Sequence, residues 1–254
     1  MNRRYFLSAA LLGLASLAIA QDEPLPKAET ILDRYVEVTG GKAAYEKRKN
    51  EVEIGTVEIK AQGLKGTVTR YTAEPAEGYL IMEIDGVGKL ESGMAKGVAW
   101  DKNAMLGPRI KTGAEKAQAL REFTFNSAIR WREMNQKVET VGTDTVDGEL
   151  CYKVVLTPAE GPAETMYFQK KSGLAVRTTA IAVSPMGEAP VEMLNSDYKT
   201  LGGVLAPSKI INKAAQVEFV ITIQDVKVNQ PLPPDRFEPP AEIKALLNKS
   251  AEKK

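Results

Sequence analysis

The chain has 254 residues, of which 34 are basic and 33 acidic, and its net charge of +1 gives no electrostatic reason to expect nucleic acid or an anionic membrane as a partner. It contains no histidine, and this excludes a Ser-His-Asp triad, a Cys-His pair and any histidine-ligated metal. Cys151 is the single cysteine, so an internal disulfide is excluded. Its apolar strand pattern predicts a buried, unreactive thiol.

Residues 1–20 have the composition of a secretory signal. Arg3 and Arg4 precede an apolar run over residues 5–20, which is shorter than the about 20 apolar residues that a transmembrane helix needs. The run ends in Ala18-Ile19-Ala20, a small-x-small cleavage motif, and polar residues follow. We therefore expect cleavage after Ala20 and a periplasmic location, reached by the Sec or the twin-arginine route. An uncleaved N-terminal anchor is the alternative.

After a short polar lead, the spacing of apolar residues predicts a helix from about residue 29 to residue 49. Gly40-Gly41 interrupts it, and this pair predicts a C-cap followed by a second short helix around Tyr45. The apolar residues at helical spacing are Ile31, Leu32, Tyr35, Val36 and Val38.

From Glu51 onward the apolar period changes to two, which predicts antiparallel strands with one buried and one solvated face. Residues 112–135 return to helical spacing and predict a helical insertion, with a second helix starting at Asn126-Ser127. Asp147-Gly148 is a strong hairpin signal among the later strands. The expected strands begin at 51 and cover 66–72, 79–85, 89–94, 97–101, 138–145, 150–157, 165–170, 175–183, 191–199, 204–212 and 216–228.

These elements predict an α+β fold that is mainly antiparallel β. A meander of about eleven strands must curl to protect its inner face, so we expect a strongly curved, half-open β-barrel covered by the N-terminal helix and the mid-chain insertion. The composition shows no linker that divides residues 21–240, which predicts a single domain. Its last part, residues 229–240, is rich in proline and is expected to lie extended on the surface. Residues 241–254 are expected to form a polar, flexible tail.

Several turn-and-strand patterns resemble those of periplasmic proteins similar to the lipoprotein carrier LolA and to outer-membrane lipoprotein-sorting proteins. The patterns span most of residues 29–240. The resemblance implies a half-open β-barrel covered by helices, with an apolar cavity that holds acyl chains; it assigns no ligand-contact residue. The patterns are Ile31-Leu32 with Gly40-Gly41, Tyr45 and Gly55; the strand over residues 148–158; Tyr167-Phe168 with Ser172-Gly173-Leu174 and Arg177; Asp197-Tyr198-Lys199 with Gly203-Val204 and Pro207; and Asn229 with Phe237 and Pro239.

Four aromatic residues lie in or near the helical insertion and are the candidate ligand-binding residues. Ligand pockets are mainly apolar and aromatic, so these side chains are expected to form a wall or lid of the cavity. Packing between helix and sheet is the alternative, since large aromatics dominate protein cores. The seven methionines after residue 80 are scattered and are expected to be mostly core residues. The four aromatic candidates are Trp100, Phe123, Phe125 and Trp131.

Three acidic pairs are the candidate catalytic carboxylates. Residues two apart on a strand share a face, so such a pair could flank a cleft as glycosidases require. Glu51 and Glu53, however, lie opposite Val52 and Ile54, which predicts ordinary solvated surface. We therefore expect no enzyme, no catalytic residue, no metal and no cofactor. The three pairs are Glu51 with Glu53, Glu83 with Asp85, and Asp144 with Asp147.

Three functions remain open from the sequence. The leading hypothesis is a monomeric, non-enzymatic periplasmic carrier or binding protein whose partner is a hydrophobic ligand, such as a lipid or the acyl chains of a lipoprotein. The second is a module that docks onto another envelope protein, with its cavity filled by its own side chains. The third is a histidine-free hydrolase, which needs a buried carboxylate pair in a polar cleft. An open apolar hollow favours the first hypothesis, and a packed interior favours the second.

Overall fold

The computed structural model describes residues 24–214 and 217–251. Within them, thirteen antiparallel strands form one sheet whose order is β6-β5-β4-β3-β2-β1-β13-β12-β11-β10-β9-β8-β7. The predicted signal peptide and its cleavage site lie outside the described residues. The strands are β1 (Asn50–Ile59), β2 (Leu64–Ala73), β3 (Glu77–Ile84), β4 (Gly88–Ala95), β5 (Val98–Asn103), β6 (Gly107–Lys111), β7 (Lys137–Val146), β8 (Glu149–Thr157), β9 (Glu164–Gln169), β10 (Ala175–Ser184), β11 (Gly187–Leu201), β12 (Val204–Ala214) and β13 (Val217–Val228).

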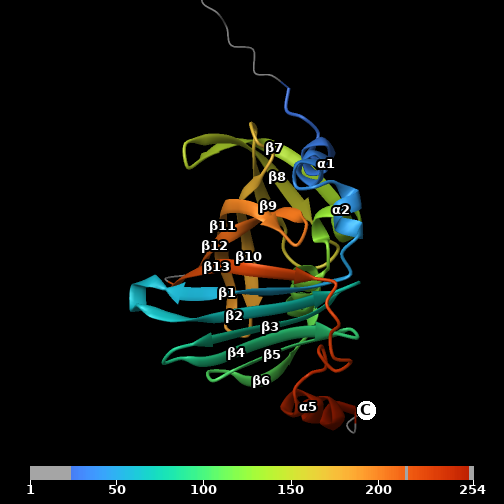
Figure 1. The fold of residues 1–254 in the computed structure, drawn as a ribbon, viewed down its shortest axis with the longest axis vertical. Coiled ribbons are helices and arrows are strands. Elements are labelled where there is room, and N and C mark those ends of the chain that lie inside the picture. Colours follow the sequence, from blue (N-terminus) through green and yellow to red (C-terminus); the bar gives the residue numbers. More distant parts are fainter. Residues whose placement is uncertain (1–23, 215–216, 252–254) are drawn as a thin grey trace, which may run out of the picture.

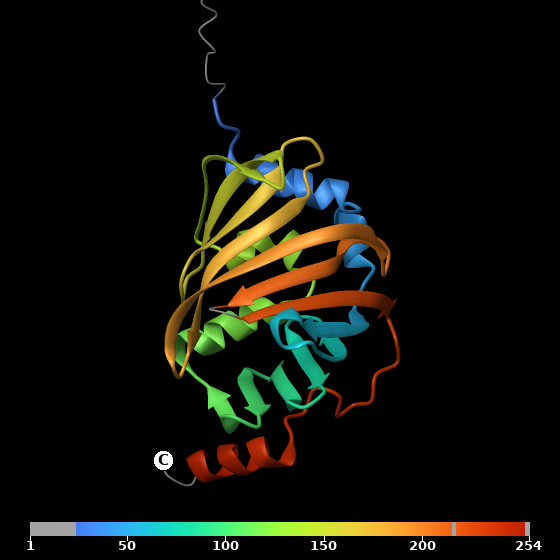
Figure 2. The same cartoon turned by 90° about the vertical axis from the view of Figure 1, so that its left-hand side faces the viewer.

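The sheet is strongly curved and unclosed, as Figures 1 and 2 show. Its first and last strands pair with each other at the centre, with Val57 opposite Ile221. The N-terminal half of the sheet therefore ends at β6 and the C-terminal half at β7, and these two edges do not meet. The prediction of a curved, mainly antiparallel half-barrel is confirmed, although the strand number is thirteen and not about eleven.

Short helices accompany the sheet, and most of them pack on its concave face. The N-terminal pair is confirmed, with Gly41 at a φ of 77° between the two helices. The mid-chain insertion joins the edge strand β6 to the edge strand β7. The helices are α1 (Ala28–Val38), α2 (Lys42–Glu46), η1 (Lys60–Gln62), α3 (Gly113–Phe123), η2 (Ser127–Arg130), α4 (Trp131–Met134) and α5 (Ala241–Ala251).

The strand register shows which residues face the concave side. Met94 and Ala99 pack against Ala119 and Phe123 of α3. Alternate residues of a strand share a face, and following the pairing from β4 through β3 and β2 to β1 places Glu51, Glu53, Val57 and Ile59 on that same side. The expectation for Glu51 is therefore wrong: it lies on the concave face and is only 8% exposed.

Glu51 is buried because its charge is compensated locally. Arg48, which follows α2, forms an ion pair with it, and Thr72 of β2 donates a hydrogen bond of 3.0 Å to its second carboxylate oxygen. A buried carboxylate needs such partners, since an unpaired one costs several kcal/mol or changes its protonation. The pair joins the end of α2 to the first two strands.

The predicted C-terminal tail contains a helix that contacts the sheet. Residues 241–251 form α5, which packs beside β6 on the outer side of the sheet (Figure 1). Ile243 of α5 has no exposed surface, and Glu242 accepts a hydrogen bond of 2.6 Å from Lys102 of β5. On the way to α5, Arg236 stacks on Tyr71 of β2 with 4.4 Å between its guanidinium carbon and the ring centroid.

We predict that Ile243→Asp detaches α5, because it places a charge at a position without solvent contact. In a Trp131→Phe background, the emission of Trp100 should then shift to longer wavelength, since Trp100 is only 1% exposed. A chain shortened to residue 240 should show the same shift, whereas Ala245→Asp, on the exposed side of α5, should not. An unchanged spectrum in both altered chains would contradict this account of α5.

Candidate ligand-binding site

The concave face carries a set of apolar strand residues that we call the apolar patch. Val57, Ile59 and Ile84 are buried, and the other members are only partly buried. Every member comes from a strand, so side chains of the sheet alone form this cluster. It is a candidate contact surface for an apolar ligand. The patch consists of Val57, Ile59, Leu64, Met82, Ile84, Leu90, Val217, Phe219 and Ile221.

Helix α3 lies across the concave face and is tied by charged groups to the N-terminal half of the sheet. Arg109 of β6 forms two hydrogen bonds, of 2.9 and 2.8 Å, with the Glu115 carboxylate and one of 2.7 Å with Asp101. These acids raise the pKa of Arg109, and the largest cause is the hydrogen bonding that its guanidinium donates to Glu115. At the other end of α3, Arg70 donates a hydrogen bond of 2.6 Å to the carbonyl of Glu122, where a cation favours the helix dipole.

The same helix is also tied to the C-terminal half of the sheet. The side-chain amide of Gln118 donates to the carbonyl of Ile181 at 2.6 Å and accepts from the backbone N–H of Val183 at 2.9 Å. Arg121 forms an ion pair of 2.8 Å with Glu164 at the start of β9. Helix α3 therefore bridges the two halves of the open sheet, and Figure 2 shows it behind the strands in this position.

Besides the Arg48–Glu51 ion pair, neutral hydrogen-bonding groups hold helices α1 and α2 on the sheet. The carbonyl of Thr39, which follows α1, accepts a hydrogen bond of 2.8 Å from the backbone N–H of Leu205 in β12. Tyr45 donates a hydrogen bond of 2.8 Å to the Thr39 hydroxyl. Tyr198 of β11 donates one of 2.6 Å to the carbonyl of Ala175. Burial raises the pKa of the Tyr35 and Tyr198 phenols, which interact with each other.

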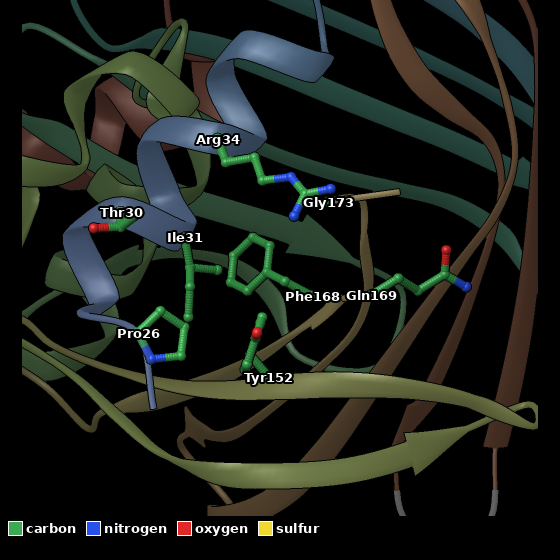
Figure 3. A pocket seen from close by; sticks show the side chains of 8 residues that line it. All are labelled: Pro26, Thr30, Ile31, Arg34, Tyr152, Phe168, Gln169 and Gly173. Carbon is green, nitrogen blue, oxygen red and sulfur yellow. The ribbon is translucent and has the colours of Figure 1, made fainter. Parts of the chain in front are cut away.

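A small pocket lies between the beginning of α1 and strands β8 and β9 (Figure 3). Its volume is about 100 Å³. Phe168 has no exposed surface and packs edge-on against Tyr35, with 5.6 Å between ring centroids. Figure 3 shows the Arg34 side chain passing above Phe168 toward Gly173. The pocket is lined by Pro26, Thr30, Ile31, Arg34, Tyr152, Phe168, Gln169 and Gly173.

The structure does not bring the four predicted aromatic residues together. Trp100 lies on the outer face, where it covers Gly93 and contacts Tyr79 with 5.3 Å between ring centroids. Phe123 lies on the concave side against Gly78. All four are buried, with exposures between 0 and 7%. Their role as ligand contacts stays a prediction.

The other two aromatic candidates pack at junctions between elements. Phe125 lies 5.7 Å from the guanidinium carbon of Arg48. Trp131 packs with Ile31 and Leu32 of α1 and with Leu156 of β8. Among the methionines, Met82 belongs to the apolar patch, whereas Met105 and Met186 are 82 and 77% exposed in hairpin turns.

Sequence reasoning missed both the apolar patch and the pocket. The sequence contained a signal for the patch. Val57 and Ile59 occupy the same alternate positions of the strand as Glu51 and therefore face the same side of the sheet. The pocket had a weaker signal, since it combines an exposed position of α1 with a hairpin turn far along the chain. Within residues 24–214 and 217–251, no helix is long and apolar enough to cross a membrane, and no group of three His, Cys, Asp or Glu side chains could hold a metal ion.

We predict that Gly78 and Phe123 are energetically coupled. A Cβ at Gly78 would lie 1.9 Å from the Phe123 ring, so Gly78→Ala should displace α3 and destabilise the fold by about 1–3 kcal/mol. Phe123→Ala alone should cost about 3–5 kcal/mol. The double variant should lose less unfolding free energy than the sum of the two single losses, because the Cβ at residue 78 no longer clashes with a phenyl ring. Urea denaturation measures all three, and simple additivity would show that the close approach has no energetic effect.

The buried phenols predict a loss of stability at alkaline pH. Because burial raises the pKa of Tyr35 and Tyr198 above that of the unfolded chain, their contribution is complete below about pH 10 and is lost as the pH rises toward their folded-state values. Tyr198→Phe should therefore reduce the fall of the urea midpoint between about pH 9 and 11. Tyr152→Phe, in the pocket wall, serves as the control, and an equal effect of both changes would contradict the prediction.

Comparisons with known proteins show which solved structures have a similar fold. No family model and no curated protein sequence matches the chain. Among solved structures, a DUF1329 family protein from Desulfovibrio piger is 14% identical with a TM-score of 0.55, and the match covers 83% of this chain and 97% of that one. A LolA superfamily protein from Nitrosomonas europaea is 12% identical with a TM-score of 0.56, covering 85% of this chain and 99% of that one.

A third structure, described as an outer membrane lipoprotein-sorting protein domain, comes from Vibrio parahaemolyticus. It is 13% identical with a TM-score of 0.54, and the match covers 87% of this chain and 99% of that one. At such low identity these matches carry information about the fold and not about the activity. They confirm the resemblance drawn from the sequence: the chain has the fold of the LolA superfamily.

Proposed function

We propose that this protein is a non-enzymatic periplasmic carrier or binding protein that shelters an acyl chain, of a lipid or of a lipoprotein, on the concave face of its sheet. The apolar patch carries this proposal. Six of its nine members are only partly buried although all are apolar, and such a surface gains free energy when a ligand covers it. The names of the similar structures, which include lipoprotein sorting, support the same function.

The magnitude of the effect is sufficient for binding. An acyl chain that hides roughly 300 Å² of apolar surface gains about 7 kcal/mol at about 25 cal/mol per Å², before the cost of ordering the chain. Leu120 is a further exposed apolar side chain, 43% exposed, on the helix α3 that bridges the two halves of the sheet. The patch and α3 together offer a sheet wall and a helical cover for one ligand.

The second candidate, a module that docks onto another envelope protein, is favoured by a different observation. The pocket under α1 holds only about 100 Å³, and Phe123, Phe168 and Trp131 fill the space beneath the helices with their own side chains. A protein with this function would bind no acyl probe, so the experiment below separates the two.

The hydrolase hypothesis gains no support from its three acidic pairs. Glu51 is paired with Arg48, and Glu53 lies 3.5 Å from Arg70. Glu83 and Asp85 are exposed on the sheet and its hairpin turn, as are Asp144 and Asp147. A carboxylate that neutralises an arginine in the fold is poorly suited to accept or donate a proton in a reaction.

The carrier proposal predicts that a charge in the apolar patch abolishes ligand binding. Met82→Lys should lower the affinity for the fluorescent fatty acid cis-parinaric acid by at least about tenfold, because the ligand would have to desolvate the ammonium group. Ile81→Lys introduces the same group at the preceding residue of β3, on the outer face, and should leave the affinity within about twofold. Native mass spectrometry of the protein purified from cells should show a lipid adduct that Met82→Lys removes.

Equal effects of the two lysines would place the ligand elsewhere than on the patch. Absence of any adduct, together with no binding of the probe by the unaltered protein, would exclude the carrier and favour the docking module. Circular dichroism of both variants verifies that the fold is retained.

A further inference from the structure

The pocket beneath α1 has a size and a wall that suit a short apolar group. Pro26, Ile31, Tyr152 and Phe168 supply its apolar lining. Its volume of about 100 Å³ is below that of a cavity of about 150 Å³ that accepts benzene. A long acyl chain therefore cannot enter as a whole. A tail of a few carbon atoms fits.

The mouth of this pocket is basic. Arg34 lines it from α1, and Lys170 lies over the Tyr152 ring, with 4.7 Å between its ammonium nitrogen and the ring centroid. Lys171 is the next residue and is exposed. None of the eight lining residues is acidic. Within the described part of the chain, none of these three cations has a carboxylate within 4.0 Å, although other arginines on the concave face are paired with acids.

Arg34 is held in place while most of its donors stay available. Its guanidinium donates one hydrogen bond of 2.9 Å, to the carbonyl of Lys171 in the turn between β9 and β10. A guanidinium has five N–H groups in a planar fork that matches a carboxylate. Gly173 permits this position, because a Cβ there would lie 3.1 Å from Arg34 Nε. The turn thus orients a cation at the rim of an apolar pocket.

We propose that this pocket binds a short-chain carboxylate of about four to six carbon atoms, with its tail against Phe168 and its carboxylate on Arg34, as a ligand site separate from the apolar patch. The charge at the mouth selects an anion over a neutral or cationic head. The pocket volume selects a short tail. The site does not depend on the proposed acyl-chain function, because no residue of the patch lines it.

Titration with three probes that share one tail tests this proposal. Hexanoate, hexanol and hexylamine are added to the full mature chain at about pH 7.5, and backbone amide shifts are followed by NMR. Hexanoate should bind most tightly and hexylamine most weakly, with the largest shifts at Ile31, Phe168 and Gly173. Affinity should rise by about three- to fourfold for each methylene from butanoate to hexanoate and then stop rising, so that dodecanoate gains nothing further at this site.

Two variants examine the two parts of the site. Arg34→Gln should weaken hexanoate about three- to tenfold and leave hexanol within about twofold, whereas Lys42→Gln, the same charge change at an exposed position of α2, should affect neither. Thr30→Phe, at the exposed rim of the pocket, should abolish hexanoate binding. Met82→Lys should leave hexanoate binding intact, which distinguishes this site from the patch.

Several results would overturn the proposal. They are no saturable shift at tens of millimolar hexanoate, equal affinities for the three head groups, shifts that map to the apolar patch, or an equal effect of Arg34→Gln and Lys42→Gln. Binding of cis-parinaric acid without binding of hexanoate would leave the carrier function standing and remove this second site alone.

Discussion

The concave face of an open, curved sheet carries apolar side chains that the sheet itself does not bury. Covering this face is the constraint on which the rest of the structure depends. A closed barrel would bury the inner surface by itself. Here β1 and β13 pair at the centre while β6 and β7 remain apart. The chain therefore has to supply helices at the two places where it leaves the sheet: before the first strand and between the edge strands.

The two covers that result differ in chemistry. Helices α1 and α2 are fixed by tyrosine hydroxyl groups, by a backbone hydrogen bond to β12 and by the buried Arg48–Glu51 ion pair. Helix α3 is fixed by Arg109, Arg121 and Gln118 through ion pairs and an amide. Partly exposed ion pairs are individually weak and are screened by salt. The ion pairs of α3 are therefore expected to weaken as the salt concentration rises.

Much of the fold could be predicted from the sequence because it depends on local period. The change from a helical period to a period of two located β1, and Asp147-Gly148 located a hairpin whose residues have φ angles of 48 and 82°. Strand β6 was not predicted from the sequence, and it contains Pro108, a residue that is unfavourable inside a strand. It is tolerated there because β6 is an edge, where a missing N–H costs no ladder hydrogen bond.

The errors concern contacts that the alternation of polar and apolar residues in one strand does not reveal. Glu51 seemed solvated because nothing in its own strand reveals that Arg48 turns back to neutralise it. Trp100 was grouped with Phe123 because both lie near the helical insertion in the sequence. However, successive residues of a strand point to opposite faces: Ala99 of β5 packs against α3 on the concave face, and Trp100 lies on the outer face. The candidate site could be predicted less well than the fold, because both the apolar patch and the pocket combine residues that are far apart in the sequence.

The contact of Gln118 with β10 has a consequence for how this architecture tolerates sequence change. Its side-chain amide forms hydrogen bonds with the backbone groups of residues 181 and 183 and not with their side chains, as a neighbouring strand would. Substitutions of residues 181 and 183 therefore keep these two hydrogen bonds, as long as residue 183 retains its backbone N–H. At this contact, the link between α3 and the C-terminal half of the sheet therefore depends on the Gln118 side chain and on the backbone of β10, and not on the side chains of residues 181 and 183.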